Sequence, residues 1–338
     1  MAQSIPKTTK QWNVVGQNGL ESLEFTEQPL PQLGDTQVLV KLRGASLNFR
    51  DIAVTQGMFP WGSEPGVVPG SDGAGFVLAV GKHVTRFQPG DNVITGLGAS
   101  VDGTLRSVGA FDEQALVSMA KGLTFTEAAT LTCAGVTAWN ALFGLSGKQV
   151  SAGDWVLTQG TGGVSIFALQ FAKAVGARVI ATTSSSEKAK LLERLGADHI
   201  INYRETPGWG SVARELTGGV GVDYVIEVAG PNTMKQSVAS VKLDGVIVIL
   251  GSVGSDGSAK DMPGLMNCWM NLFTARGIWV GSRLQMEDMC RAIEANIDRS
   301  RPVIDPQTFT LEQAKEAWES LYRNSLKLCG WYSLESFG

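Results

Sequence analysis

The sequence predicts an α/β protein in which a doubly wound parallel-sheet domain is inserted into a β-rich domain. Up to about residue 130, short apolar runs are separated by Gly, Pro and Asp, which is typical of strands joined by tight turns. From Asp154 onward, apolar strands alternate with amphipathic segments of helix length, which is the pattern of βαβ units. The length of 338 residues fits two domains.

The composition excludes several classes of protein. With 43% hydrophobic residues and a net charge of −4, the chain is neither disordered nor suited to nucleic acid. Its four cysteines and two histidines are scattered, so neither a disulfide scaffold nor a metal site built mainly from them is expected. No apolar run is long enough for a signal peptide or a transmembrane helix. We therefore expect a cytoplasmic protein that binds a small molecule and no membrane.

Three strands are predicted in the first part of the chain. They are Val38–Leu42, Gly75–Val80 and Asn92–Ile94. Turns are predicted at Gly81–His83 and Pro89–Asp91, between the second and third strands. His83 is therefore expected at the surface.

The middle of the chain is predicted to alternate regularly between strands and helices. The predicted strands are Trp155–Thr158, Arg178–Thr182, His199–Asn202, Tyr224–Val228 and Val246–Leu250. The predicted helices are Val164–Val175, Ser186–Leu195, Ser211–Thr217 and Met234–Val241. Two later helices are predicted at Met286–Ile297 and Leu311–Tyr322. Ser186 is expected to cap its helix and Gly196 to end it, while His199 is expected to be structural.

A glycine-rich turn connects the first of these strands to the first helix. It reads Gln159-Gly160-Thr161-Gly162-Gly163-Val164-Ser165, with serine in place of the third glycine of G-x-G-x-x-G. Gly160 allows a tight turn, Gly162 lets backbone N–H groups approach a pyrophosphate, and the small Ser165 lets helix and strand pack closely. The positive end of the helix favours phosphate. This strand–turn–helix context predicts a dinucleotide site.

The end of the second strand indicates which dinucleotide binds. An NAD site usually carries Asp or Glu there, about 20 residues after the glycine turn, to bind the ribose 2′-hydroxyl. This chain instead offers Thr183, Ser184 and Lys188, whose hydroxyls and positive charge suit a 2′-phosphate. We therefore expect NADP(H) rather than NAD(H). In the alternative interpretation, Lys188 is a solvated surface residue.

These features together make the chain resemble the medium-chain dehydrogenases/reductases. The motifs are Gly44–Asp51 (GASLNFRD), Pro69–Gly75 (PGSDGAG), Pro89–Val93 (PGDNV), Leu131–Trp139 (LTCAGVTAW) and Gly196–Arg204 (GADHIINYR). The resemblance covers nearly the whole chain. It implies a GroES-like β-rich catalytic domain over residues 1–130 and 281–338. It also implies a Rossmann domain with a doubly wound parallel sheet over residues 131–280, and an active site in the cleft between the two.

The resemblance is to the zinc-free branch of this family. Zinc-containing members carry Cys-His in the first motif, Gly-His-Glu in the second and often Cys before Ala-Gly-Val-Thr. At these positions the chain has Asn48-Phe49, Gly70-Ser71-Asp72 and Cys133. Because Asn and Ser are poor Zn²⁺ ligands and one Cys cannot hold the ion, we expect no metal. Cys133 is expected to be a small buried residue rather than a catalytic thiol.

The resemblance also implies further contacts with the cofactor. It places Lys188 and Tyr203 near the adenosine phosphate, and Thr137 and Asn48 near the nicotinamide. The other positions that it implies are Gly251, Val253, Ser282 and Arg283. A half-buried strand residue is the alternative interpretation of Tyr203.

Hydride transfer without zinc needs an electron-poor carbon and a means of stabilising the charge that develops on the substrate. Asn48 is the expected catalytic residue, because its amide could donate to a carbonyl or enolate oxygen. In related enoyl reductases a Tyr donates the proton, but this chain has Phe59 at that position. Arg50, Asp51 and Asp72 are expected to form a buried ion-pair network.

The predicted function is a zinc-independent, NADPH-dependent reductase of an enone, an enoyl compound or a quinone. The alternatives are a zinc-free alcohol or carbonyl oxidoreductase, and a cofactor-binding pathway enzyme without net redox turnover. Phe59, Trp61, Met266 and Trp269 are expected to form an apolar wall of the substrate pocket. By analogy with the family, Met262–Phe273 makes the contacts of a homodimer.

Overall fold

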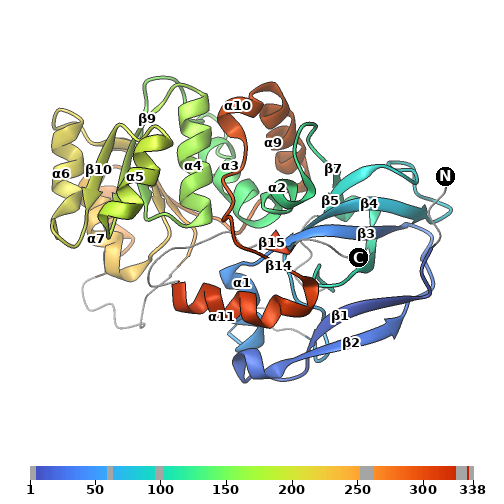
Figure 1. Cartoon of the computed structure of the whole chain (residues 1–338). Coiled ribbons are helices and arrows are strands. Elements are labelled where there is room, and N and C mark those ends of the chain that lie inside the picture. The colour runs from blue at the N-terminus through green and yellow to red at the C-terminus, as the bar shows by residue number, and fades with distance from the viewer. Residues whose placement is uncertain (1–4, 59–63, 96–101, 252–261, 325–332, 335–338) are drawn as a thin grey trace. The chain divides into compact units, whose positions relative to one another are not determined.

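The computed structural model describes residues 5–58, 64–95, 102–251, 262–324 and 333–334. The chain forms two compact units, which Figure 1 shows and which are described separately. The first unit comprises Met1–Cys133, Ser282–Ile297 and Arg301–Gly338. The second comprises Ala134–Gly281 and Asp298–Ser300.

The second unit contains a six-stranded parallel sheet. Its strands are β8 (Trp155–Gln159), β9 (Arg178–Thr183), β10 (His199–Asn202), β11 (Val222–Glu227), β12 (Val241–Ile249) and β13 (Thr274–Gly277). They lie in the order β10-β9-β8-β11-β12-β13, and every neighbouring pair is parallel. This confirms the predicted doubly wound sheet. The chain runs outward from β8 to β10 and then returns to β11, so the strand order reverses between β8 and β11.

Helices surround this sheet (Figure 1). They are α3 (Val136–Phe143), α4 (Gly163–Ala174), α5 (Ser186–Arg194), α6 (Trp209–Leu216), α7 (Pro231–Ser240) and α8 (Met266–Asn271). Helix α3 packs on α4, and α6 packs on α7. The apolar core includes Leu157, Ile180, Ile201, Val225 and Ile247, one from each of five strands. Strands buried on both faces consist of continuous apolar runs, which is why the sequence predicts them well.

The first unit is built on a mostly antiparallel sheet. Its strands are β3 (Gln37–Ser46), β4 (Asp72–Val80), β5 (Asn92–Thr95), β6 (Val108–Asp112), β7 (Leu116–Ser118), β14 (Thr308–Phe309) and β15 (Ser333–Leu334). The order is β14-β15-β3-β4-β5-β7, with β6 also paired to β3. A separate hairpin pairs β1 (Thr8–Val14) with β2 (Leu23–Pro29). This architecture is the predicted GroES-like β-rich domain.

Helices complete the first unit. They are α1 (Phe49–Thr55), α2 (Phe125–Ala129), α9 (Arg283–Ala295) and α11 (Ala314–Asn324), with 3-10 turns at Gly19–Ser22, Glu113–Ala115 and Leu311–Gln313. A π-helical turn (Leu131–Gly135) and α10 (Ile297–Ser300) lie where the chain passes between units. Trp318 is fully buried, and the indole N–H of Trp12 donates to the Leu311 carbonyl at 2.7 Å. Within the described ranges, no helix is both long and apolar enough to span a membrane.

The structure differs from the sequence predictions at several places. The cap of α5 is Ser185, whose hydroxyl accepts from the Lys188 backbone N–H at 3.4 Å, and Ser186 is the first helical residue. The prediction of Ser186 as the cap was wrong because three consecutive serines offer the same local signal. The predicted helix over residues 311–322 begins as a 3-10 turn before α11. Several bounds also differ; strand β12, for example, begins at Val241 rather than at the predicted Val246.

Candidate functional site

The glycine turn lies at the switch point of the parallel sheet. Gln159 ends β8, and Gly160 follows with a φ of +72°. A Cβ at Gly160 would meet no atom within 4 Å, so its left-handed backbone, not crowding, favours glycine there. Gly162 is the N-cap of α4. The first backbone N–H groups of a twelve-residue helix therefore open at the edge where ligands of doubly wound sheets bind.

Ser165 does more in this turn than replace a glycine. Its side chain is buried, and its hydroxyl donates to the Gln159 carbonyl at 2.7 Å. This bond ties the first turn of α4 to the last residue of β8. A glycine could provide the close packing but not this bond, so the departure from G-x-G-x-x-G adds a specific contact.

Two buried hydroxyls at this edge have no hydrogen-bond partner among the described residues. They belong to Thr161 in the glycine turn and to Thr183 at the end of β9, and their residues are 4% and 1% exposed. Leaving a buried polar atom unbonded is costly, so such atoms point to a missing polar partner. A dinucleotide with phosphate and ribose oxygens would supply it, and the residues present therefore fit that group.

The ends of β9 and β10 bring together the residues predicted at the adenosine phosphate. The Tyr203 backbone N–H donates to the Thr183 carbonyl at 3.0 Å, and Ser184 follows Thr183 directly. The Tyr203 residue is 40% exposed, and Lys188 is partly exposed in the first turn of α5. No carboxylate stands at the end of β9; Glu187, on the first turn of α5, is exposed.

A polar cluster in the first unit surrounds Asn48. The Asn48 amide nitrogen donates to Asp72 Oδ2 at 2.9 Å, and the Ser46 hydroxyl donates to the same oxygen at 2.5 Å. Asp72 is fully buried; the Cys133 backbone also donates to its carboxyl, and no side chain donates to Oδ1 among the described residues. Burial raises the pKa of Asp72 to about 7; the bonds from Ser46 and Asn48 oppose this shift, and the nearby Asp51 adds to it.

Only part of the predicted ion-pair network is present beside this cluster: Arg50 and Asp51 are paired, whereas Asp72 makes no ion pair among the described residues. The Arg50 guanidinium donates to the Ser71 hydroxyl at 2.9 Å, and that hydroxyl donates to Asp51 Oδ1 at 2.7 Å. Arg50 Nη1 lies 3.9 Å from the same carboxylate oxygen. Asp51 Oδ2 accepts from the Asn48 backbone N–H at 2.8 Å, which fixes the start of α1. Burial raises the pKa of Asp51 despite these favourable contacts.

The Cys133 residue as a whole is partly exposed, so the prediction of a buried residue holds only for its sulfur. It lies in the π-helical turn, where the chain leaves the first unit. Burial around its sulfur raises the thiol pKa well above its usual value, and the carboxyl groups of Asp72 and Asp51 raise it further. The thiol is therefore protonated at neutral pH and is a weak nucleophile, in keeping with a non-catalytic role.

The donors at the three zinc-ligand positions of the family do not suit Zn²⁺. The Asn48 amide nitrogen and the Ser71 hydroxyl are hydrogen-bond donors to carboxylates. Cys133, the third, is a usual zinc ligand, but one cysteine alone cannot hold the ion. No group of three or more His, Cys, Asp or Glu side chains that could hold a metal ion occurs in the described ranges.

The other predicted site residues are spread over several elements. Thr137 is 7% exposed on α3, and a Cβ at Gly251 would lie 3.3 Å from the Val228 carbonyl. Ser282 caps α9, and Arg283 forms an ion pair with Glu287. Val253, Phe59 and Trp61 lie outside the described residues. Met266 and Trp269 lie on α8 and are 63% and 71% exposed.

The two histidines are not part of these clusters. His83 is exposed in a turn, as predicted. His199 begins β10 and stacks on Trp155 with ring centroids 5.6 Å apart, which confirms a structural role.

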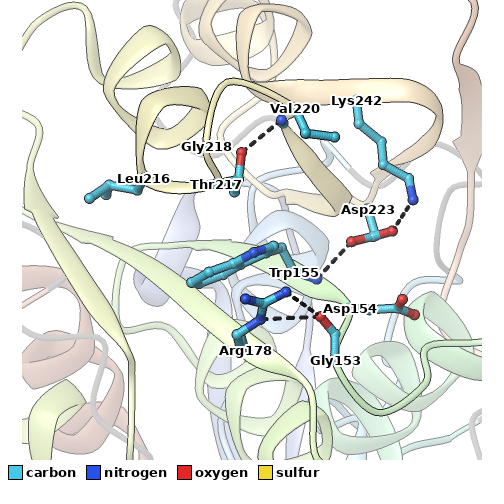
Figure 2. A pocket seen from close by; sticks show the side chains of 11 residues that line it. Gly153, Asp154, Trp155, Arg178, Leu216, Thr217, Gly218, Val220, Asp223 and Lys242 are labelled. Carbon is cyan, nitrogen blue, oxygen red and sulfur yellow. Dashed lines mark hydrogen bonds and ion pairs between the residues drawn. The ribbon is translucent and has the colours of Figure 1, made fainter.

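A cavity of about 510 Å³ lies at the opposite edge of the parallel sheet, where β8, β9 and β11 begin (Figure 2). Its two cations are already engaged. The Arg178 guanidinium lies 4.2 Å from the Trp155 ring centroid and donates to the Gly153 carbonyl at 2.8 Å. Lys242 pairs with Asp223. Because neighbouring groups already engage both cations, neither is free to bind a phosphate of the cofactor.

The contact between Glu227 and Gln159 at the switch point was not predicted from the sequence. Glu227 ends β11 and is fully buried, and it accepts from the Gln159 side-chain nitrogen at 2.8 Å. In sequence, the available signal was a carboxylate directly after the apolar pair Val225-Ile226. Its partner is 68 residues away, which no local pattern reveals.

Comparisons with known proteins agree with this geometry. Residues 34–127 match the family described as alcohol dehydrogenase GroES-like domain, and residues 163–295 match the family described as zinc-binding dehydrogenase. A zinc-type alcohol dehydrogenase-like protein of Schizosaccharomyces pombe is 43% identical over 322 residues, covering 89% of this chain and 92% of that protein. A quinone oxidoreductase of Pseudomonas aeruginosa is 31% identical over 311 residues, covering 90% and 93%.

A solved structure is also similar. It is that of a candidate alcohol dehydrogenase from Sinorhizobium meliloti, which superposes with a TM-score of 0.87. Its sequence is 34% identical, and the match covers 98% of this chain and 100% of that one. These similarities extend over both units.

Proposed function

Because this chain belongs to the medium-chain dehydrogenase/reductase family, we propose that it is a zinc-independent, NADP(H)-dependent reductase of an activated alkene or a quinone. The chain is an oxidoreductase of this superfamily, whose members bind nicotinamide cofactors. The observation that carries the finer proposal is the donor set at Asn48, Ser71 and Cys133. In that set, the Asn48 amide, which donates to Asp72, occupies a position at which zinc-containing relatives have a metal ligand.

The proposed cofactor site is centred on the glycine turn. The N–H groups at the start of α4 suit a pyrophosphate, and Thr161 and Thr183 provide unpaired hydroxyls. The absence of a carboxylate at the end of β9, together with Ser184 and Lys188, supports a 2′-phosphate. The further proposed contacts are Asn48, Thr137, Gly163, Val164, Tyr203, Gly251, Val253, Ser282 and Arg283.

The substrate class follows from the charge that this chain can stabilise. A nicotinamide, when bound, would supply a hydride to an electron-poor carbon of the substrate, and the electron pair displaced from that carbon's double bond would place negative charge on the substrate oxygen. A simple ketone would develop a localised alkoxide, for which an acid or a metal is needed. In an enone or quinone the charge is delocalised, so one amide donor from Asn48 and a proton from solvent suffice.

The direct test is turnover of the purified protein. We expect oxidation of NADPH with a conjugated enone or a quinone, and faster reaction with NADPH than with NADH. Because no step depends on a metal, prior incubation with EDTA and phenanthroline should leave the rate within about twofold. The measurement is the loss of nicotinamide absorbance for each substrate and cofactor.

Two results separate this proposal from its alternatives. Loss of activity with chelator would contradict zinc independence. For the cofactor, Lys188→Ala should lower the preference for NADPH over NADH by about tenfold, because a charge-assisted contact to phosphate is removed. An unchanged preference would mean that Lys188 is a solvated surface residue.

The alcohol dehydrogenase names of the relatives support a second candidate, a zinc-free alcohol or carbonyl oxidoreductase. The same panel of substrates distinguishes it, since aldehydes and secondary alcohols would then react while enones would be inert. An unchanged nicotinamide absorbance with every substrate class would instead favour a cofactor-binding protein without net redox turnover.

We also propose that the protein is a homodimer formed through α8 and β13. On and beside α8, apolar side chains are strongly exposed: Leu265 at 88%, Trp269 at 71% and Met270 at 70%. Strand β13 is the edge strand of its sheet, paired with β12 alone among the described strands. An apolar patch beside an open sheet edge is typical of a protein interface.

The dimer can be tested by sedimentation equilibrium. We expect a mass of two chains for the wild type, and a shift towards one chain for Trp269→Glu, because the variant buries a charge in an apolar interface. A control away from this patch is Val175→Glu, since Val175 is 38% exposed at the end of α4, which packs on β8 and β9 rather than on β13. A wild-type monomer at micromolar concentration would refute the proposal.

A further inference from the structure

Glu227 is a buried carboxylate that the proposed reaction does not use. Its side chain is fully buried at the carboxyl end of β11. Oε1 accepts from the backbone N–H groups of Ala229 at 3.0 Å and Gly230 at 2.9 Å, and from the Thr233 hydroxyl at 2.6 Å. Oε2 accepts from the Gln159 amide at 2.8 Å and from the Ser237 hydroxyl. Both oxygens are therefore occupied.

Such a carboxylate is costly to bury unless every bond is made, because an ion leaves water at a large free-energy cost. Here five donors come from three parts of the second unit: the end of β8, the loop after β11 and helix α7. The carboxylate has no acceptor position left for substrate or cofactor. The role of Glu227 is therefore to connect the parts of the second unit from which its donors come.

Gln159 is the link from Glu227 to the glycine turn. The Gln159 side chain is buried, and it uses both ends: its nitrogen donates to Glu227, while its Oε1 accepts from the Val228 backbone N–H at 3.2 Å. Its backbone carbonyl accepts from Ser165. Gly160 follows directly, and its N–H donates to the Thr182 carbonyl of β9 at 2.9 Å. The glycine turn is thus held by β9 on one side and by the contact between Gln159 and Glu227 on the other.

We propose that Glu227, acting through Gln159, is a positioning residue that fixes the glycine turn for binding the pyrophosphate of the nicotinamide cofactor. The inference rests on the proposed function, since it concerns the same cofactor site. The pyrophosphate is common to NADPH and NADH, whereas the 2′-phosphate is not. Loosening the contacts between Glu227 and Gln159 therefore lowers the affinity for both cofactors by the same factor. The ratio of the two affinities stays unchanged.

The test is a pair of binding titrations, with dissociation constants for NADPH and NADH read from nucleotide fluorescence. Gln159→Met keeps the size of the side chain and the charge of Glu227, and removes the link. We expect both dissociation constants to rise about tenfold, which is the effect of losing one or two hydrogen bonds to a charged group. Glu227→Gln, which replaces one acceptor oxygen by a donor, should have at least this effect.

The matched control is Glu113→Gln in the first unit. Glu113 is 8% exposed, and its Oε2 accepts from the backbone N–H groups of Thr85 and Arg86, each at 3.0 Å. This variant should lower thermal stability without changing either dissociation constant. Should Gln159→Met not fold, Ser237→Ala, which removes one donor to Glu227, takes its place in the same titration.

The outcomes are distinguishable. A folded Gln159→Met that binds both nucleotides within twofold of the wild type would overturn the positioning role. So would a change in NADPH affinity alone. A wild-type protein that binds neither nucleotide would instead overturn the proposed function, independently of Gln159.

Discussion

Asn48→Ala is expected to lower kcat about 100-fold while leaving KM for the substrate nearly unchanged, as removal of one donor to a developing oxyanion typically does. The Asn48 amide nitrogen carries two hydrogens. One is bound by Asp72 Oδ2 at 2.9 Å, and Asn48 makes no second side-chain donation among the described residues. Because the Asp72 contact orients the amide with its nitrogen fixed, the second N–H is available to an oxygen that gains charge in the transition state.

The matched control for this prediction is Ser46→Ala. Ser46 donates to the same oxygen of Asp72, but it is fully buried and cannot contact substrate. Both variants therefore remove one hydrogen bond from Asp72, and both are expected to change stability. Steady-state kinetics with an enone separate the roles, because Ser46→Ala should keep kcat near the wild-type value. Equal kcat losses in the two variants would place the effect in Asp72 rather than in the Asn48 amide.

The parallel sheet was predictable because its signals are local. Strand β10 has the predicted bounds, His199–Asn202, and β9 and β8 are each one residue longer than predicted. Each of these apolar runs ends at Gly, Ser or Asn, so a short window of sequence is enough. The order of the strands was predictable only through the doubly wound pattern, which the pairing of β8 with both β9 and β11 confirms.

The β-rich unit and the polar clusters were less predictable because their contacts are distant in sequence. The predicted strand over residues 38–42 is only half of β3, whose ten residues pair with three other strands. The contact between Asn48 and Asp72 spans 24 residues, and the contact between Gln159 and Glu227 spans 68. Residue types suggest that such groups need partners, but the fold decides which partner each one finds.

Asp72 gives the second large expected effect, on the pH dependence of stability. Burial raises its pKa from 3.8 to about 7 in the folded chain. Between these two values the folded state holds a proton that the unfolded state has released. The free energy of unfolding contributed by Asp72 therefore falls as pH rises through this window, and it is constant above about pH 8. A shift of this size corresponds to a loss of roughly 4 kcal/mol across the window.

Asp72→Asn should remove this loss, because the amide does not titrate and its oxygen can still accept from Ser46 and Asn48. In urea unfolding at pH 5, 6, 7 and 8, the variant is expected to gain on the wild type steadily as pH rises. Asp244→Asn is the matched control. Lys148 holds the pKa of Asp244 below its usual value, so that carboxylate stays ionised in both states from pH 5 to 8. The free energy of unfolding of Asp244→Asn, plotted against pH, should run parallel to that of the wild type. A parallel plot for Asp72→Asn would contradict the raised pKa of Asp72.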